Sequence, residues 1–289
     1  MSKWRNLLHG MSMVATFAAL SLALNGGRVF PGAHASALTP SPPELRESGD
    51  DAKPTKLSRD RSSEEEISPA FSLAKNRILS AVPDQIERYF NVFMYVSKAT
   101  DGALAQKMFV FHRVKRGRLV PYAEWQVSTG REAIEWDNGR EVDTKTPAGV
   151  FVLDPRRFHR EYYAKNWNNA PMHHAMFLDL KTHGFGTGVA IHEAVGADKV
   201  DRLGRRDSAG CIRLSPEHAK ELFDKVHGTT RGRIPVIGVD ARGSTDTSGK
   251  IQRNKAGKPI FRNGYRALLI VEDYDGDGDV LSSADEYTH

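Results

Sequence analysis

Short runs of β-favouring residues, each bounded by a turn sequence, fill the middle of this 289-residue chain. The first three runs are separated by the turn sequences TDGA and KRGR: NVFMYVSKA, QKMFVFHRV and LVPYAEWQVSTG. Four further runs follow along the chain: AGVFVLD, APMHHAMFLDL, GVAIHEA and RIPVIGVD. No repeat with a period of about 20 to 50 residues recurs. The pattern predicts one mainly β domain with a few helices over residues 92–240.

Two helical segments are expected beside the strands. Ser215 stands where an N-cap is expected, Pro216 follows as the first helical residue, and Gly228 ends the segment. Its buried face consists of apolar residues at i, i+3, i+4 and i+7: Ala219, Leu222, Phe223 and Val226. The other segment is a helical lead-in over residues 69–91, which Pro83 breaks or restarts.

The N-terminal residues 1–35 have the composition of an export signal. Lys3 and Arg5 supply a positive start, and an apolar run over residues 13–24 has the length of a signal-peptide core. The run is shorter than the roughly 20 residues that span a bilayer, and an uncleaved N-terminal anchor is the alternative. Residues 36–68 are rich in Pro, Ser and charges, which predicts a disordered linker. We therefore expect export of the domain to the periplasm or cell wall.

The charge balance of the chain is mildly basic. Lys and Arg number 41 against 36 Asp and Glu, which gives a formal net charge of +5, and no basic helix stands out. Nucleic-acid binding is weakly supported by these values, because a polyanionic wall or a membrane surface fits them equally well. We expect no nucleic-acid partner, and membrane contact only through the N-terminal segment if it is uncleaved.

Cys211 is the only cysteine in the chain. In an oxidising compartment it has no intramolecular disulfide partner, so the thiol is either buried and inert or chemically active. The polar loop SAGC favours an active thiol, which needs a base within hydrogen-bond reach. His192, at the end of the run GVAIHEA, is the best candidate base, although a structural role for this histidine stays open. Gly210 would let backbone amides turn toward a substrate carbonyl beside the thiol.

The residues AIH, followed by a glycine-bearing loop and SAGCIRL, resemble the signature of YkuD-type L,D-transpeptidase catalytic domains. That signature is a strand-borne histidine followed by Ser/Thr-x-Gly-Cys-hydrophobic-Arg/Asn. Upstream, VSTGR, TPAGVF and MFLDL stand where the family carries STG, TPxGxF and the strand that leads into the histidine. The resemblance covers residues 92–240 and implies the β-sandwich or barrel catalytic domain of that family.

The resemblance implies a role for each matching residue. Cys211 would be the nucleophile, accessible and partly ionised near neutral pH, and His192 would be its base. Ser208 would order the loop by hydrogen bonding, and Gly210 with the Cys211 amide would shape the oxyanion site. Arg213 would hold the active-site wall or a substrate carboxylate.

Two residues depart from the family pattern. Glu193 follows the histidine where glycine or serine is common, and Ala209 stands where histidine is frequent. In this family a backbone carbonyl often orients the base, so Glu193 need not disable it. Ala209 removes a second imidazole, which puts secondary substrate contacts in doubt but not the nucleophile.

The activity that the resemblance implies is peptidoglycan L,D-transpeptidation, which contributes to cell wall biogenesis and to cell shape. The cysteine would form a thioester with a tetrapeptide stem, release D-alanine and pass the acyl group to an amine acceptor, without a cofactor. An L,D-carboxypeptidase, in which water takes the place of the amine, is the alternative. A non-catalytic wall-binding domain is less favoured because the motif residues are all present. The acceptor amine and the composition of the stem peptide stay open.

A zinc site is a weaker alternative for the same region. His173, His174, His183 and His192 together with Cys211 could suggest one, but they lack the compact spacing of metal motifs. We expect His173 and His174 to lie on opposite faces of one strand.

The segment 241–289 is expected to be a tail with a calcium-binding loop or simply a solvated acidic end. Asp273, Asp275 and Asp277 occupy positions 1, 3 and 5 of a sequence that resembles an EF-hand loop. The closing carboxylate does not fit, because position 12 falls on Ala284. Calcium at these three aspartates is therefore one of the two alternatives for this segment.

Overall fold

The computed structural model describes residues 68–137 and 139–273. The predicted signal segment 1–35 and residues 36–67 of the predicted linker lie outside the described residues. Within the described part of the chain, we find no helix with the length and apolar character needed to cross a membrane.

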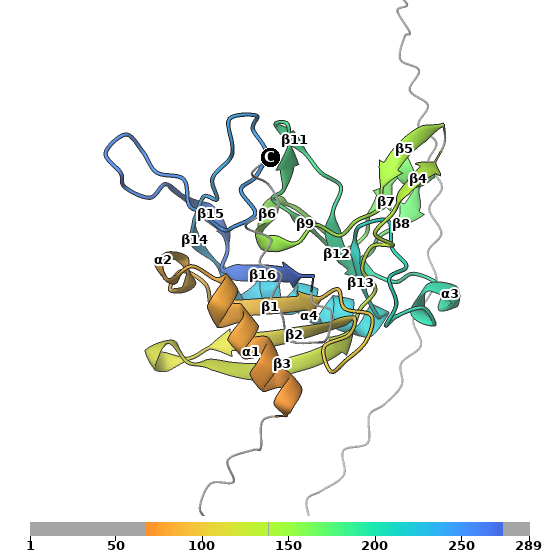
Figure 1. Ribbon diagram of the computed structural model, residues 1–289, viewed down its shortest axis with the longest axis horizontal. Helices are drawn as coiled ribbons and strands as arrows, with labels where there is room; N and C mark the ends of the chain where they lie inside the picture. The colour runs from red at the N-terminus through yellow and green to blue at the C-terminus, as the bar shows by residue number, and fades with distance from the viewer. Residues whose placement is uncertain (1–67, 138, 274–289) are drawn as a thin grey trace, which may run out of the picture. The chain divides into compact units, whose positions relative to one another are not determined.

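An eight-stranded sheet forms the framework of the domain (Figure 1). Its strands are β1 Val92–Ser97, β2 Lys107–Arg113, β3 Leu119–Gln126, β6 Gly149–His159, β9 Ala175–Leu178, β12 Ala190–Glu193, β13 Ile212–Leu214 and β16 Ala267–Glu272. They lie in the order β13-β12-β9-β6-β16-β1-β2-β3. Ser128, just after β3, forms an antiparallel bridge with Arg213 of β13, so the two edges of the sheet meet. The sheet is therefore a nearly closed, barrel-like structure, which confirms the predicted mainly β domain.

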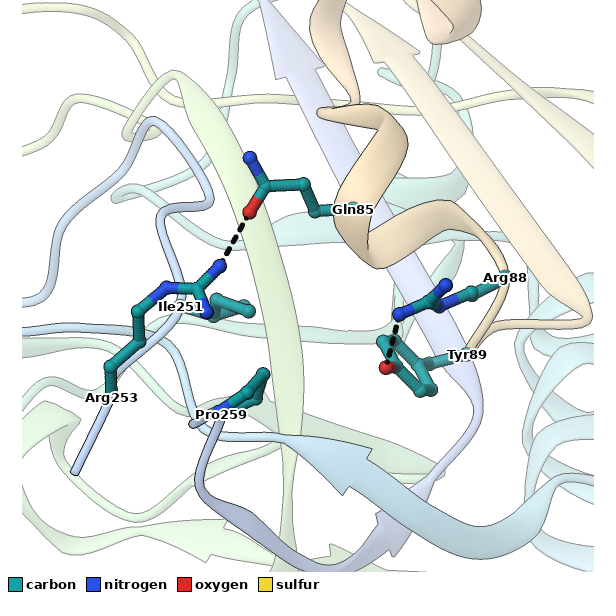
Figure 2. A pocket seen from close by; sticks show the side chains of 6 residues that line it. All are labelled: Gln85, Arg88, Tyr89, Ile251, Arg253 and Pro259. Carbon is teal, nitrogen blue, oxygen red and sulfur yellow. Dashed lines mark hydrogen bonds between the residues drawn. The ribbon is translucent and has the colours of Figure 1, made fainter. Parts of the chain in front are cut away.

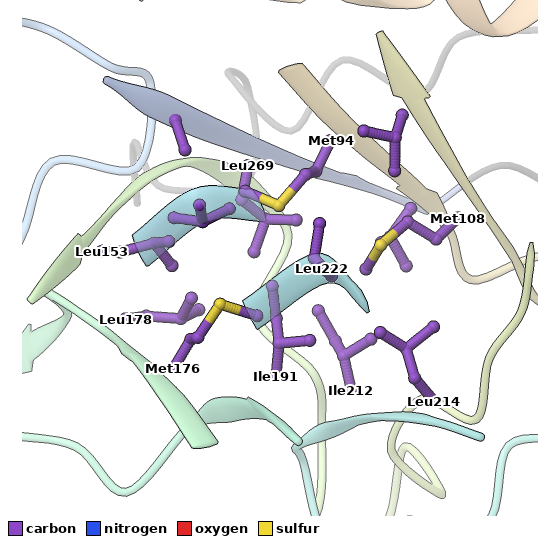
Figure 3. Packing of buried hydrophobic residues seen from close by; sticks show 14 of the residues in the cluster. Met94, Met108, Leu153, Met176, Leu178, Ile191, Ile212, Leu214, Leu222 and Leu269 are labelled. Carbon is purple, nitrogen blue, oxygen red and sulfur yellow. The ribbon is translucent and has the colours of Figure 1, made fainter. Parts of the chain in front are cut away.

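Both faces of the central strands are buried. Along β1, Met94 belongs to one apolar cluster and its neighbours Phe93 and Tyr95 belong to a second cluster, because successive side chains point to opposite faces. The first cluster packs the sheet against α4 (Pro216–Thr229), as Figure 3 shows for ten labelled residues. The second cluster packs it against α1 (Pro69–Ala81). Figure 1 shows α1 in front of the sheet and α4 behind it.

The helices begin where the sequence predicts. The Ser215 side chain accepts a hydrogen bond from the His218 amide at 3.2 Å, which makes it the N-cap of α4. The helix continues one residue past Gly228, its predicted end, to Thr229. In the lead-in, α1 ends at Ala81, and a short α2 (Asp84–Glu87) follows the break at Pro83.

The domain continues well beyond residue 240, where the sequence analysis ended it. Strand β14 (Arg231–Pro235) pairs with β15 (Phe261–Tyr265), and β16 lies between β1 and β6 in the centre of the sheet. Residues 261–272 are thus part of the fold and not of a tail. A local pattern could not show this, because the partners of β16 lie more than a hundred residues earlier in the chain.

The expected strand through His173 and His174 is wrong. The run APMHHAMFLDL divides into the short strand β8 (Ala170–Pro171), a turn that holds both histidines, and β9. His174 has a φ of +50°, a left-handed conformation that is incompatible with a continuous strand.

The other described two-stranded hairpins pair β4 (Ile134–Asp137) with β5 (Arg140–Asp143), β7 (Tyr163–Ala164) with β8, and β10 (Lys181–Thr182) with β11 (Phe185–Gly186). The helix α3 (Ala197–Val200) follows β12.

Candidate active site

The thiol and the imidazole lie on neighbouring parallel strands. In the register of β12 and β13, Ile191 is opposite Ile212 and His192 is opposite Arg213. Cys211 directly precedes β13 and lies two residues before Arg213, so its side chain points to the same face as that of His192. The two isoleucines point to the other face, into the core. The pairing thus brings Cys211 and His192 together as diagonal neighbours.

His192 is oriented by a backbone carbonyl. The ring is 7% exposed, and its Nδ1 lies 2.8 Å from the carbonyl oxygen of Glu193. Because a carbonyl oxygen can only accept, Nδ1 carries the hydrogen and Nε2 is left as an acceptor. Burial lowers the pKa of His192 to about 4, and the positive charges of Arg213 and Lys199 act in the same direction. At neutral pH the ring is a neutral imidazole that can take up a proton.

Cys211 is half-buried against a small apolar cluster. The cluster consists of Ala164, Met172, Ala175, Phe177 and Ala190, with Tyr162 and Trp167 packed against it. The Cys211 Sγ donates to the carbonyl oxygen of Gly188 at 3.6 Å. Burial raises the pKa of the thiol, and the charges of Arg213 and Arg157 oppose that rise only in part. The resting pair is a neutral thiol beside a neutral imidazole, which differs from the partly ionised thiol expected from the sequence.

A neutral resting pair predicts a specific pH dependence. The rate of Cys211 alkylation by iodoacetamide should keep rising through neutral pH, because the thiolate fraction grows until the raised thiol pKa is reached. The acid limb of kcat/KM should lie near pH 4 and not near 6.5, because His192 stays neutral down to about that value. The alkylation rate constant of Cys211 and the initial rates of turnover, each measured over a pH series, test the two expectations. A plateau of alkylation in the acidic range would indicate a thiolate–imidazolium pair and contradict this arrangement.

The loop before Cys211 is held by Ser208. This side chain is fully buried; its Oγ donates to the Cys211 carbonyl oxygen and accepts from the Gly210 amide at 3.1 Å. Gly210 has a φ of +102°, and a Cβ there would lie 2.9 Å from the carbonyl oxygen of Lys145, so only glycine fits. Because Ser208 takes up the Gly210 amide, the Cys211 amide is the candidate donor to an oxyanion.

Arg213 is bound to the wall of the site. Its Nη1 lies 2.9 Å from Oδ2 of Asp207, and Oδ1 of the same carboxylate lies 3.1 Å from Nη1 of Arg202. These contacts fit the first of the two roles expected for Arg213, in which it holds the active-site wall. A contact with a substrate carboxylate stays a prediction.

Arg157 is a site residue that the sequence analysis missed. Its guanidinium lies over the ring of Phe177 at 3.7 Å and donates to the Thr187 carbonyl oxygen at 2.8 Å. Its positive charge acts to lower the pKa of the Cys211 thiol. Arg157 is on β6, and the sequence around it has no motif that would have indicated this position.

Glu193, the residue that departs from the family pattern, connects β12 to the histidine turn. Its Oε2 lies 3.1 Å from Nδ1 of His174, and its amide donates to the His173 carbonyl oxygen at 3.0 Å.

His183, another histidine of the zinc alternative, is exposed between β10 and β11. Among residues 68–137 and 139–273, no three or more His, Cys, Asp or Glu side chains form a group that could hold a metal ion.

The predicted calcium set falls at the edge of the described residues. Asp275 and Asp277 lie outside them. Asp273 is described, and its Oδ1 lies 2.6 Å from Nζ of Lys98, so its carboxylate is held in an ion pair. Calcium binding stays a prediction that the described part of the chain does not support.

A cavity of about 450 Å³ lies elsewhere, between α2 and the segment that connects β14 to β15 (Figure 2). It is lined by Gln85, Arg88, Tyr89, Ile251, Arg253 and Pro259. In Figure 2, Arg253 reaches across to the side chain of Gln85, a hydrogen bond of 2.7 Å. The lining holds neither a thiol nor an imidazole, so the chemistry is assigned to β12 and β13.

Comparison with known proteins gives a family and several similar structures. Residues 101–237 match the family model YkuD, the L,D-transpeptidase catalytic domain. Among solved structures, an L,D-transpeptidase from Xylanimonas cellulosilytica is 15% identical with a TM-score of 0.34, and the match covers 70% of this chain and 76% of that chain. An L,D-transpeptidase from Mycobacterium smegmatis is 17% identical with a TM-score of 0.32, covering 63% and 59%.

The helical cell shape determining protein Pgp2 from Campylobacter jejuni is also similar, with 15% identity, a TM-score of 0.33 and coverage of 70% and 56%. The match therefore spans less than two thirds of the Mycobacterium and Campylobacter chains. No curated protein sequence matches this chain significantly.

Proposed function

We propose, from the match of residues 101–237 to the YkuD family model, that the chain is a cysteine-dependent peptidoglycan L,D-transpeptidase. One observation supports the proposal above the others. The only cysteine of the chain shares one face of two paired strands with a buried histidine whose Nδ1 is bound by a carbonyl. A nucleophile, a base and a group that orients the base are thus present together.

In the first half-reaction the thiol attacks a tetrapeptide stem. The Cys211 proton passes to Nε2 of His192 as Sγ bonds to the carbonyl carbon of the third, diamino-acid residue. The negative charge that develops on the carbonyl oxygen faces the Cys211 amide. Collapse of this tetrahedral species breaks the C–N bond to the terminal D-alanine, whose amine takes the proton from His192. The product is a thioester and free D-alanine.

In the second half-reaction an amine of a neighbouring stem attacks the thioester. His192 accepts the proton of the amine, the C–S bond breaks, and the thiolate takes the proton back. The result is a cross-link between two third residues and a regenerated enzyme. Water in place of the amine gives a tripeptide, and the enzyme then acts as an L,D-carboxypeptidase. The catalytic steps use no metal or organic cofactor.

Mass spectrometry of wall fragments tests the proposed function. The purified full chain is incubated with disaccharide-tetrapeptide fragments, and the products are compared with those of a heat-denatured sample. Cross-linked dimers that have lost one D-alanine are expected. Tripeptide monomers alone would assign the carboxypeptidase reaction, and unchanged tetrapeptides would contradict both activities.

Export is part of the same proposal. The positively charged start and the apolar run over residues 13–24 support a place outside the cytoplasmic membrane, where peptidoglycan is cross-linked. A reporter fused after Ser68 should be active in the periplasm or outside the cell. Activity confined to the cytoplasm would contradict export without bearing on the chemistry of the domain.

A further inference from the structure

The hydroxyl of Thr146 lies between two glycines from the motifs STG and SAGC. Its Oγ1 accepts a hydrogen bond from the Gly130 amide at 2.7 Å and donates to the Gly210 carbonyl oxygen at 3.0 Å. Thr146 is fully buried. Because an amide can only donate and a carbonyl can only accept, the hydroxyl hydrogen must point at Gly210.

The contact with Gly210 sets the direction of the Cys211 amide. The peptide bond between Gly210 and Cys211 is planar and trans, so its N–H points opposite to its C=O. Holding the carbonyl therefore holds the amide. Ser208 fixes the backbone on both sides of this peptide, through the Gly210 amide and the Cys211 carbonyl oxygen. We propose that Thr146 is a positioning residue for the oxyanion site and acts through this one peptide group.

Thr146 is itself held firmly at both of its backbone groups. Its amide donates to Oε1 of Glu132 at 3.1 Å, and its carbonyl oxygen accepts from Nζ of Lys98 at 2.8 Å. The Lys98 side chain is 3% exposed, and its Nζ lies 2.7 Å from Oε2 of Glu132 and 2.6 Å from Oδ1 of Asp273. A buried cation that is paired in this way resists displacement, since its removal would leave unpaired charges. The hydroxyl is thus presented from a rigid support.

The two glycines allow the backbones to approach closely enough for this contact. A Cβ at Gly130 would lie 2.0 Å from the carbonyl oxygen of Thr144. At Gly210 a Cβ would lie 2.9 Å from the carbonyl oxygen of Lys145. The segment that carries Thr146 is therefore packed directly against both loops, and no side chain separates the hydroxyl from the Gly210–Cys211 peptide.

The test compares two reactions at the same sulfur and rests on the proposed function of Cys211. Acylation by a carbapenem forms an oxyanion, whereas alkylation by iodoacetamide does not. In Thr146→Val, which keeps the shape and loses the hydroxyl, acylation should fall about tenfold or more while alkylation stays within about twofold of the parent. Thr146→Ser, which keeps the hydroxyl, should recover most of the acylation rate. Intact-protein mass spectrometry measures both rates, and a melting curve checks the fold.

The outcomes separate the two levels of the proposal. Equal acylation rates in the parent protein and in Thr146→Val would overturn the role of Thr146 and leave the proposed function intact. Equal losses of acylation and alkylation would assign Thr146 a merely structural role and overturn it as well. A parent protein that is alkylated but never acylated would overturn the proposed function and the inference together. If Thr146→Val does not fold, the ratio of the acylation rate to the alkylation rate is measured on Thr146→Ala instead.

Discussion

Cys211→Ser is expected to lose essentially all release of D-alanine from tetrapeptide stems. A serine hydroxyl is far harder to ionise than a thiol, and His192, with a pKa of about 4, is too weak a base to compensate. The substitution removes no carbon atom and keeps a hydrogen donor toward Gly188, so the fold should persist. Release of D-alanine measures the loss, and a melting curve measures the fold.

The same variant carries an internal control. Because Cys211 is the only cysteine, Cys211→Ser should also lose all labelling by thiol reagents. Turnover at the parent rate in a protein that no longer reacts with iodoacetamide would show that another group is the nucleophile.

His192→Ala is expected to lower kcat/KM by on the order of a hundredfold or more, the usual size of a general-base contribution. The thiol remains in place, so the variant should still be alkylated by iodoacetamide at high pH, where the thiol ionises without a base. Initial rates of D-alanine release at several pH values measure the effect. The deficit should shrink as the pH rises, because hydroxide replaces part of the function of the missing imidazole.

His183→Ala is a matched control for the histidine substitution. His183 is exposed in the hairpin of β10 and β11 and makes no contact with β12 or β13 among the described interactions. This variant should keep the parent rate. A loss of less than about tenfold in His192→Ala, or an equal loss in both variants, would contradict the assignment of His192 as the base.

The sequence predicts those parts of the molecule that depend on local pattern. The alternation of the strands indicates the mainly β domain, and Ser215 and Pro216 indicate the start of α4, because a cap and a proline act on the nearest turn. His192 lies on β12 and Cys211 directly precedes the neighbouring parallel strand β13, a pairing that the motif and the loop between them do not by themselves predict.

Other features depend on contacts between distant segments and could not be predicted. The centre of the sheet contains β16, whose position between β1 and β6 is decided by pairing and not by its own composition. The hydrogen bond from Thr146 to Gly210 joins loops 64 residues apart. The raised pKa of Cys211 follows from its burial against the apolar cluster, which no spacing in the motif indicates.

These distant contacts determine the protonation states with which the proposed mechanism begins and the direction of the amide that it uses. A neutral imidazole and a neutral thiol begin the reaction together, so the proton moves as the carbon–sulfur bond forms and is not lost beforehand. Negative charge then develops on the carbonyl oxygen of the substrate, beside the amide that Thr146 and Ser208 hold in place, while His192 carries the positive charge of the proton. The proposed mechanism therefore depends on the directed amide as well as on the reactivity of the sulfur.

The most direct test of the account is to identify the covalent intermediate. The full chain is mixed with a tetrapeptide stem without an acceptor, quenched in acid, digested and examined by mass spectrometry. The account predicts an acyl group of the tripeptide on the peptide that contains Cys211, bound as a thioester that hydroxylamine removes, and one equivalent of free D-alanine. Release of D-alanine with the acyl group on another residue, or with Cys211 never modified, would contradict it.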